Sequence, residues 1–199
     1  MRGGVSALCP LLRADVQAWI HPCQKFVELF WRYRSTVPID VSLRPAVTDD
    51  HEAVGRILVS AYGPSGMAPD EPYWTALRDT AARVADAEVW VAELDGRVVG
   101  TVTWAGHGSG QREVAVDGEA EFRMLAVDPA VRGRRVGQAL LDAVVDRARR
   151  DGYEAVVLSS DGWMSTAHRM YERAGFVRVP GRDWTPVPGV DLRVYRLGL

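Results

Sequence analysis

Residues 121–139 read EFRMLAVDPAVRGRRVGQA, and this stretch decides the fold. Its first residues belong to a predicted strand over 119–127, which Asp128-Pro129 ends, and an Arg/Gly-rich segment then leads into a predicted helix over 135–150. The first turn of a helix offers unpaired backbone N–H groups and a partial positive charge, so a diphosphate is stabilised there. The order of strand, turn, basic loop and helix therefore predicts a site for a phosphate-containing ligand.

Regular structure extends from this stretch in both directions. A helix is predicted after a cap at Thr48 or Asp49, because apolar residues recur there at helical spacing. Asp95-Gly96 predicts a hairpin, because both central positions of a type I′ turn need positive φ. The other predicted strands cover residues 41–47, 88–94, 97–104, 153–158 and 190–197, and the other predicted helices cover a stretch ending near residue 85 and residues 164–174. This pattern predicts one α/β domain over residues 41–199.

The first 40 residues differ from the rest. Pro10, Pro22 and Pro38 interrupt apolar and aromatic residues there. We interpret residues 1–40 as an N-terminal extension that is either poorly ordered or forms a short helix over 23–34. Both cysteines lie in this extension, outside every motif, which favours a reducing compartment over a disulfide-stapled fold.

Charge and hydropathy exclude several classes of function. The chain has 24 basic and 26 acidic residues, so no strong field favours nucleic acid or an anionic membrane as a partner. No stretch approaches the ~20 apolar residues that span a bilayer, and the N-terminus lacks the features of an export signal. We therefore expect a cytoplasmic protein whose partner is a small molecule or a peptide.

Two linked motifs resemble the signatures of the GNAT superfamily of acyl-CoA-dependent N-acyltransferases. Arg132 and Gly137 match the pyrophosphate motif Gln/Arg-x-x-Gly-x-Gly/Ala, in which Arg135 stands at the first glycine position. The preceding MLAVDP is similar to the family's fourth strand, and YERAGF at residues 171–176 is similar to its second signature. Met164 stands where many relatives have an asparagine that contacts the pantetheine arm.

The resemblance implies a fold and a co-substrate. The implied fold is a strongly twisted mixed sheet of about six to seven strands, flanked by helices, with the fourth and fifth strands splayed apart. Acetyl-CoA would lie in this V as co-substrate, with no metal, and pass its acetyl group to an amine of a small molecule or peptide; a homodimer is possible. The implied cofactor-binding residues are Leu125, Ala126, Val127, Arg132, Gly133, Arg134, Arg135, Val136, Gly137, Gln138 and Ala139.

The resemblance also assigns catalytic roles. The backbone N–H of Val127 would polarise the thioester carbonyl, and Tyr171 would protonate the departing thiolate. Glu121 is the candidate general base, with His107 as an alternative. Period-two alternation predicts Glu119, Glu121, Arg123, Leu125 and Val127 on one face of the strand.

The resemblance implies that three loops, at residues 62–74, 106–118 and 180–189, form the acceptor pocket. Their predicted rim is partly aromatic and partly acidic, which suits a cationic amine: Asp70, Glu71, Tyr73, Trp74, Trp163 and Trp184. The alternative function is a catalytically idle CoA-binding regulatory module of the same fold, which Arg135 and Met164 favour and Tyr171 opposes.

Overall fold

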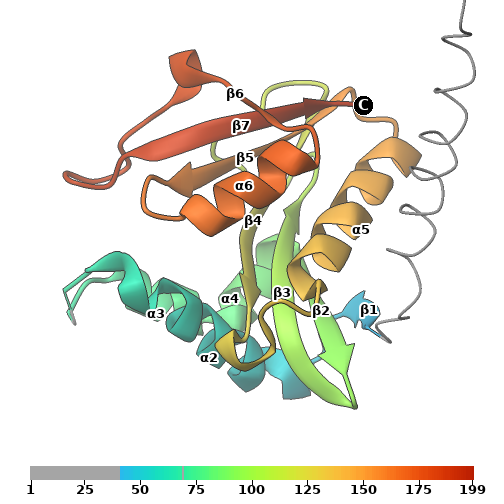
Figure 1. Ribbon diagram of the computed structural model, residues 1–199, viewed down its shortest axis with the longest axis vertical. Helices are drawn as coiled ribbons and strands as arrows, with labels where there is room; N and C mark the ends of the chain where they lie inside the picture. Colours follow the sequence, from blue (N-terminus) through green and yellow to red (C-terminus); the bar gives the residue numbers. More distant parts are fainter. Residues whose placement is uncertain (1–40, 69) are drawn as a thin grey trace, which may run out of the picture. The chain divides into compact units, whose positions relative to one another are not determined.

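The computed structural model describes residues 41–68 and 70–199, so the predicted extension over residues 1–40 lies outside the described residues. A seven-stranded sheet in the order β1-β2-β3-β4-β5-β7-β6 forms the centre of the described part (Figure 1). The strands are β1 (Ser42–Pro45), β2 (Glu88–Leu94), β3 (Arg97–Ala105), β4 (Glu119–Val127), β5 (Ala155–Asp161), β6 (Val177–Arg178) and β7 (Leu192–Gly198).

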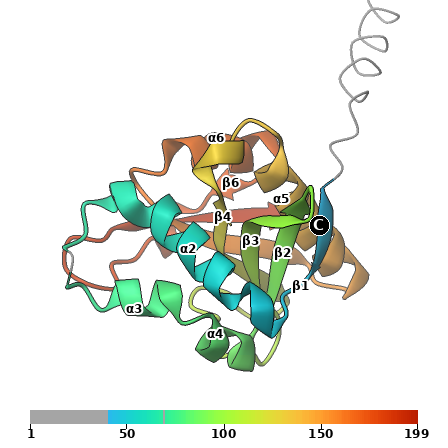
Figure 2. The ribbon, with the colours of Figure 1, turned by 90° about the horizontal axis from the view of Figure 1, so that it is seen from below.

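Helices cover both faces of this sheet (Figure 2). One face carries α2 (His51–Tyr62), α3 (Tyr73–Arg78) and α4 (Thr80–Asp86), and the other carries α5 (Val136–Arg150) and α6 (Ser165–Arg173). The predicted apolar stripe of the first helix packs on β2 and β4 through Val54, Ile57 and Leu58, all without exposed surface. On the opposite face Gly100 lets α5 approach β3, because a Cβ there would lie 2.9 Å from the Val136 side chain.

The fourth and fifth strands separate along their length. β4 and β5 run parallel and pair only at Glu119↔Ala155, Ala120↔Val156 and Glu121↔Val157. Beyond Glu121 the two strands no longer pair. On its other edge, β5 pairs with β7 along its whole length. The mixed, splayed sheet that the resemblance implied is therefore confirmed.

Most of the local signals are confirmed with small shifts in their boundaries. Asp95 and Gly96 have φ values of 53° and 72° and join β2 to β3 in an antiparallel hairpin, as predicted. The predicted helix ending near residue 85 is instead two helices, because the Asp79 side chain accepts the N–H of Ala82 and starts α4 afresh. The two-residue β6 was not predicted, since so short a strand carries no periodicity.

A β-bulge in β4 corrects one prediction. The register with β3 slips between Thr101 and Thr103, where β4 has one extra residue, and Met124 takes a left-handed φ of 52°. Glu121 and Arg123 still share the face covered by α2. After the bulge the alternation reverses, so Leu125 and Val127 face α5, where their side chains lie 3.8 and 3.4 Å from a Cβ built on Gly137. The prediction of a single face for all five residues was therefore wrong.

Candidate functional site

Beyond Glu121, one edge of β4 provides backbone groups that no strand of the described residues uses. The N–H of Asp128 donates to the carbonyl of Val99 at 2.8 Å, so Asp128 points toward β3. Because successive residues of a strand point their backbone groups to opposite edges, Leu125 and Val127 point away from β3, into the V. A ligand that lies in the V can therefore pair with β4 as an additional strand would.

The basic loop at the end of β4 has the backbone of an anion site. Gly133 and Arg135 have left-handed φ values of 82° and 59°, and Arg135 immediately precedes the first turn of α5. The loop thus keeps at Arg135 the backbone conformation that a glycine would adopt. Gly137 lies 3.4 Å, measured from a built Cβ, from both Met170 and Val127, so its missing side chain leaves the first turn open. The predicted cofactor-binding residues from 132 to 139 and from 125 to 127 come together here.

Tyr171 lies inside the molecule, on α6. It is 5 % exposed, and its ring packs edge-on against Phe122 of β4 with centroids 5.9 Å apart. Phe176 and Tyr195 flank it at 6.0 and 6.1 Å. Burial raises the pKa of the Tyr171 phenol well above its ordinary value, and the nearby Tyr195 adds to the effect. The phenol therefore stays protonated at neutral pH.

Glu121 lies at the last paired position of β4 with β5 and has no exposed surface. Its Oε2 accepts three backbone N–H groups, from Glu113, Val114 and Ala115, each at 2.9 Å. Its Oε1 is buried without a hydrogen-bond partner among the described residues. The carboxylate is thus fixed by the loop before β4, with one oxygen left unsatisfied.

A group of side chains lies beside Glu121, and of these only Tyr73 was predicted as part of the acceptor rim. Arg123 binds the Glu113 carboxylate at 2.7 Å and the Gln111 carbonyl at 3.3 Å. Tyr62 and Tyr73 pack edge-to-face with centroids 5.9 Å apart, and the Arg123 charge opposes the rise that burial causes in the pKa of both phenols. No local motif indicated this cluster, because its members come from two helices, one loop and a strand.

Other polar candidates have structural roles. Glu119 is 4 % exposed and binds Arg182 and Arg196 at 2.8 and 2.7 Å, so it ties the last hairpin to β4. Burial would raise the Glu119 pKa, but the hydrogen bonds from the two arginines outweigh it and lower that pKa. His107 is exposed, and its backbone N–H donates to the Tyr153 hydroxyl at 2.7 Å. We therefore give Glu121 precedence over His107.

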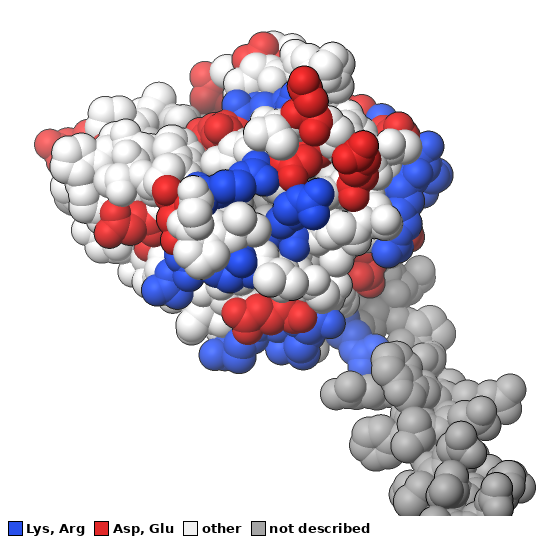
Figure 3. All heavy atoms as spheres, turned by 90° about the horizontal axis from the view of Figure 1, so that it is seen from above, with Lys and Arg blue, Asp and Glu red and all other residues white. Residues whose placement is uncertain are grey.

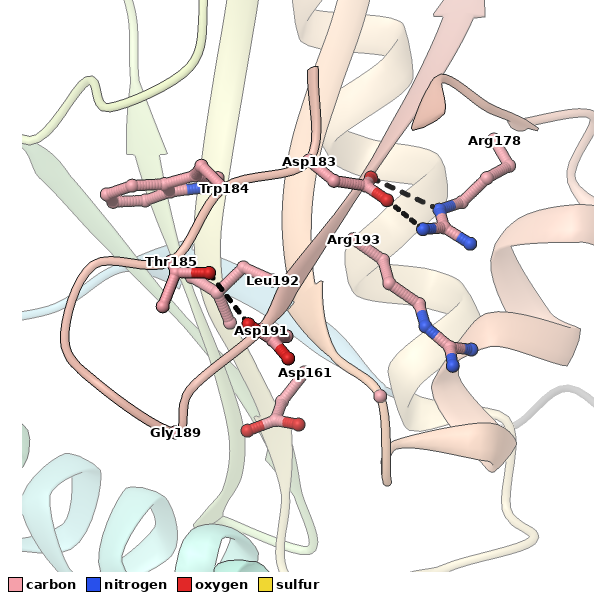
Figure 4. Close-up of a pocket in the computed structure, with 10 residues that line it drawn as sticks. Asp161, Arg178, Asp183, Trp184, Thr185, Gly189, Asp191, Leu192 and Arg193 are labelled. Atoms are coloured by element: carbon pink, nitrogen blue, oxygen red, sulfur yellow. Dashed lines mark hydrogen bonds and ion pairs between the residues drawn. The ribbon is translucent and has the colours of Figure 1, made fainter. Parts of the chain in front are cut away.

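A separate hollow of about 530 Å³ lies beside the last hairpin (Figure 4). Trp184 and Gly189 of the predicted third acceptor loop line it, together with residues around Asp161 at the end of β5. Two of its charged groups pair with each other, Asp183 with Arg178, and Asp191 accepts the Thr185 hydroxyl at 2.7 Å. The lining includes neither Tyr171 nor Glu121, so the hollow is distinct from the V.

The surface charges agree with the balanced composition. Figure 3 shows basic and acidic side chains intermingled on the face seen there. Among the residues that the structure describes, no helix combines the length and the apolar character that crossing a bilayer requires.

Comparison with known proteins gives a consistent picture. The family model described as "Acetyltransferase (GNAT) family" matches residues 48–176. N-acetylaspartate synthetase of Mus musculus is 35 % identical over 103 residues, which are 52 % of this chain and 32 % of the mouse protein. Mycothiol acetyltransferase of Sanguibacter keddieii is 40 % identical over 107 residues, 50 % of this chain and 33 % of that protein. The chain thus spans about a third of the length of these curated relatives.

Solved structures resemble the fold at low sequence identity. A GNAT acetyltransferase from Staphylococcus aureus Mu50 superposes with a TM-score of 0.63 at 17 % identity, covering 80 % of this chain and 99 % of that one. The PaiA N-acetyltransferase of Thermoplasma acidophilum, solved with coenzyme A, has a TM-score of 0.63 at 14 % identity and the same coverage. These similarities establish the fold.

Proposed function

Because the chain belongs to the GNAT family of acetyltransferases, we propose that it transfers the acetyl group of acetyl-CoA to an amine. The observation that carries the proposal is the combination of the open β4 edge, the left-handed basic loop and a buried tyrosine at one V in the sheet. The relatives named above are an N-acetylaspartate synthetase and a mycothiol acetyltransferase, so their names leave the acceptor of this chain open.

The residues at the V fit an acyl-CoA. The loop over residues 132–139 brings three exposed arginines and the unpaired N–H groups of the first turn of α5 to one place, which suits a diphosphate. A Cβ at Gly133 would meet nothing within 4 Å, so the loop is open on that side. Leu125 and Val127 offer backbone donors and acceptors to the amide groups of the pantetheine arm.

In the proposed reaction, acetyl-CoA supplies the activated acetyl group as a thioester. The protein must stabilise charge on the carbonyl oxygen, protonate the departing sulfur and remove a proton from the amine. The amine nitrogen bonds to the carbonyl carbon, and the carbon–sulfur bond breaks. The N–H groups of Val127 and Leu125 are the candidates for stabilising charge on the carbonyl oxygen, and Leu125 is the nearer to the point where β4 and β5 separate.

Two side chains handle the protons. Tyr171 gives its hydroxyl proton to the departing sulfur, and its burial keeps that proton in place until then. Glu121 takes the proton that the attacking amine loses, and Oε1 is the oxygen with free capacity because Oε2 already accepts three N–H groups. Each turnover then yields an amide, a free thiol and one net proton from the ammonium form of the acceptor.

The test is a thiol-release assay on the purified chain. Acetyl-CoA is incubated with a panel of amines, amino acids and peptides, and free thiol is measured with a chromogenic reagent alongside calorimetric binding of acetyl-CoA. We expect thiol release that depends on the amine, with the acetylated product identified by mass. Tight binding of acetyl-CoA without release for any amine would instead support the idle binding module.

A further inference from the structure

We propose that the acceptor is an amine that also carries a carboxylate, as an amino acid does, and that Arg123 binds that carboxylate. This inference rests on the proposed acetyl transfer and names the class of amine that the site accepts. Its starting point is a juxtaposition on β4: a carboxylate at Glu121 and a guanidinium at Arg123, two residues apart on the same face. In a regular strand this spacing is about 7 Å, and the register with β3 is regular between the two residues.

The negative end of this pair forms no salt bridge with a described residue, and the Arg182 charge acts on it only from beyond contact distance. Glu121 is fully buried, and its Oε1 has no partner among the described residues, none of which forms a salt bridge with it. The three amides on Oε2 hold the side chain in place but do not supply a contacting cation. In a site of low dielectric such a charge attracts the ammonium end of a ligand over several ångströms.

The positive end of the pair, Arg123, has N–H donors that its described contacts do not use. The Arg123 side chain is 16 % exposed, and its two described bonds, to Glu113 and Gln111, use two of its five N–H donors. Those bonds orient the planar fork, which matches the geometry of a carboxylate. Glu113 also links both ends of the pair, because its N–H donates to Glu121 while its carboxylate binds Arg123.

The surroundings favour a zwitterion over a simple cation. Burial raises the pKa of both Tyr62 and Tyr73, so the phenols near Arg123 stay neutral and can donate to a carboxylate. Burial also raises the pKa of Glu113, and the charge of Arg123, which Glu113 contacts at 2.7 Å, opposes that rise. An amino acid brings one charge of each sign, so its ammonium can approach Glu121 Oε1 while its carboxylate accepts from the donors that Arg123 does not use for Glu113 and Gln111.

The experiment compares matched acceptors. Phenylalanine, its carboxamide and 2-phenylethylamine share a side chain and an amine, but only the first has a carboxylate; alanine, alaninamide and ethylamine form a second set. We expect kcat/KM to be roughly 10- to 100-fold higher for the amino acids, mainly through KM, as suits charged hydrogen bonds. Arg123→Gln should remove this preference, so that this variant uses amino acids and amides with equal kcat/KM.

Two further variants keep the result interpretable. Arg123→Lys retains the charge without the fork and should keep part of the preference, and its thermal unfolding shows whether the fold survives. Arg149→Gln is the matched control, because Arg149 is 57 % exposed on α5, away from β4, and pairs only with Asp146 among the described residues. The inference would be overturned if the wild type used the amides and amines as well as the matching amino acids, or if the preference for amino acids survived Arg123→Gln. Either result would leave acetyl transfer intact. If bound acetyl-CoA released no thiol with any acceptor, the proposed function would fail, and this inference with it.

Discussion

Replacing Tyr171 with phenylalanine separates a catalytic hydroxyl from a packing role. The ring contacts with Phe122, Phe176 and Tyr195 do not involve the oxygen, so the phenylalanine ring keeps them. No described residue forms a hydrogen bond with the hydroxyl, so its removal leaves no partner unsatisfied. We therefore expect the free energy of unfolding to change by less than about 0.5 kcal/mol.

The effect on turnover should be much larger. If the hydroxyl protonates the departing sulfur, Tyr171→Phe should lower kcat by about 10²-fold or more, a barrier increase of at least ~2.7 kcal/mol. Acetyl-CoA affinity should hardly change, since the ring still lines the V. Steady-state thiol release and calorimetry on one purified variant provide both values.

The pH profile adds an independent check. Burial raises the pKa of Tyr171 above the ordinary phenol value, so the proton that it donates is present throughout an assay range of about pH 6 to 9. The shape of the rate–pH curve should therefore be the same in wild type and Tyr171→Phe, with only the height reduced.

A matched control is available at Tyr153, whose hydroxyl accepts the N–H of His107 and whose ring packs on Trp104. Tyr153→Phe should cost about 1 kcal/mol of stability and leave kcat unchanged. Near-normal turnover in well-folded Tyr171→Phe, or an equal loss in both variants, would refute the general-acid role.

Three further changes test other parts of the site. Glu121→Gln should lower kcat by at least about 10²-fold and destabilise the fold by roughly 2–3 kcal/mol, since three charge-assisted bonds become neutral; unchanged thermal unfolding would argue against the described contacts. Gly137→Ala should fit the protein at ordinary van der Waals distance and keep or raise stability by up to about 1 kcal/mol, yet weaken acetyl-CoA binding in calorimetry; undiminished binding would place the diphosphate elsewhere. Glu119→Gln should cost about 2 kcal/mol at pH 7. Ion pairing lowers the folded-state pKa of Glu119. The loss of stability is therefore complete above the unfolded-state pKa near 4.3 and fades as the pH falls through the lower folded-state pKa. Denaturant unfolding should accordingly give a larger difference in the free energy of unfolding between variant and wild type at pH 7 than at pH 3.

Signals within a few residues accounted for most of the fold. Asp95-Gly96 fixed a hairpin, and the apolar stripe from Val54 to Leu58 fixed the buried face of α2, because each depends on local backbone preference or on one period of a helix. Met124 shows where this reasoning stops. A methionine in a left-handed conformation has no sequence signature, yet the single extra residue reversed the faces of Leu125 and Val127.

In the candidate site, too, the contiguous part could be predicted from the sequence, and the part that depends on tertiary packing could not. The loop over residues 132–139 could be predicted because its glycines and arginines are contiguous. The partners of Glu121 could not, since the three N–H groups that bind it belong to a loop whose course depends on the completed sheet. Arg123 and Tyr62 were missed for a related reason: they lie 61 positions apart in the chain, and only the packing of α2 on β4 brings them together.

The three-residue pairing of β4 with β5 has a consequence for how the molecule unfolds in parts. Strands β1 to β4 with α2 form one half of the sheet and strands β5 to β7 form the other. Among the described residues, these few parallel pairs and the adjoining hydrogen bond from the Glu154 N–H to the Gly118 carbonyl join the backbones of the two halves. We expect the halves to open as separate cooperative units, with amide protons near residues 155–157 exchanging with solvent sooner than those in the middle of β2 and β3. An acyl-CoA lying in the V would contact both halves and stabilise the short pairing between β4 and β5. Hydrogen exchange at this pairing should therefore slow on binding more than exchange within either half.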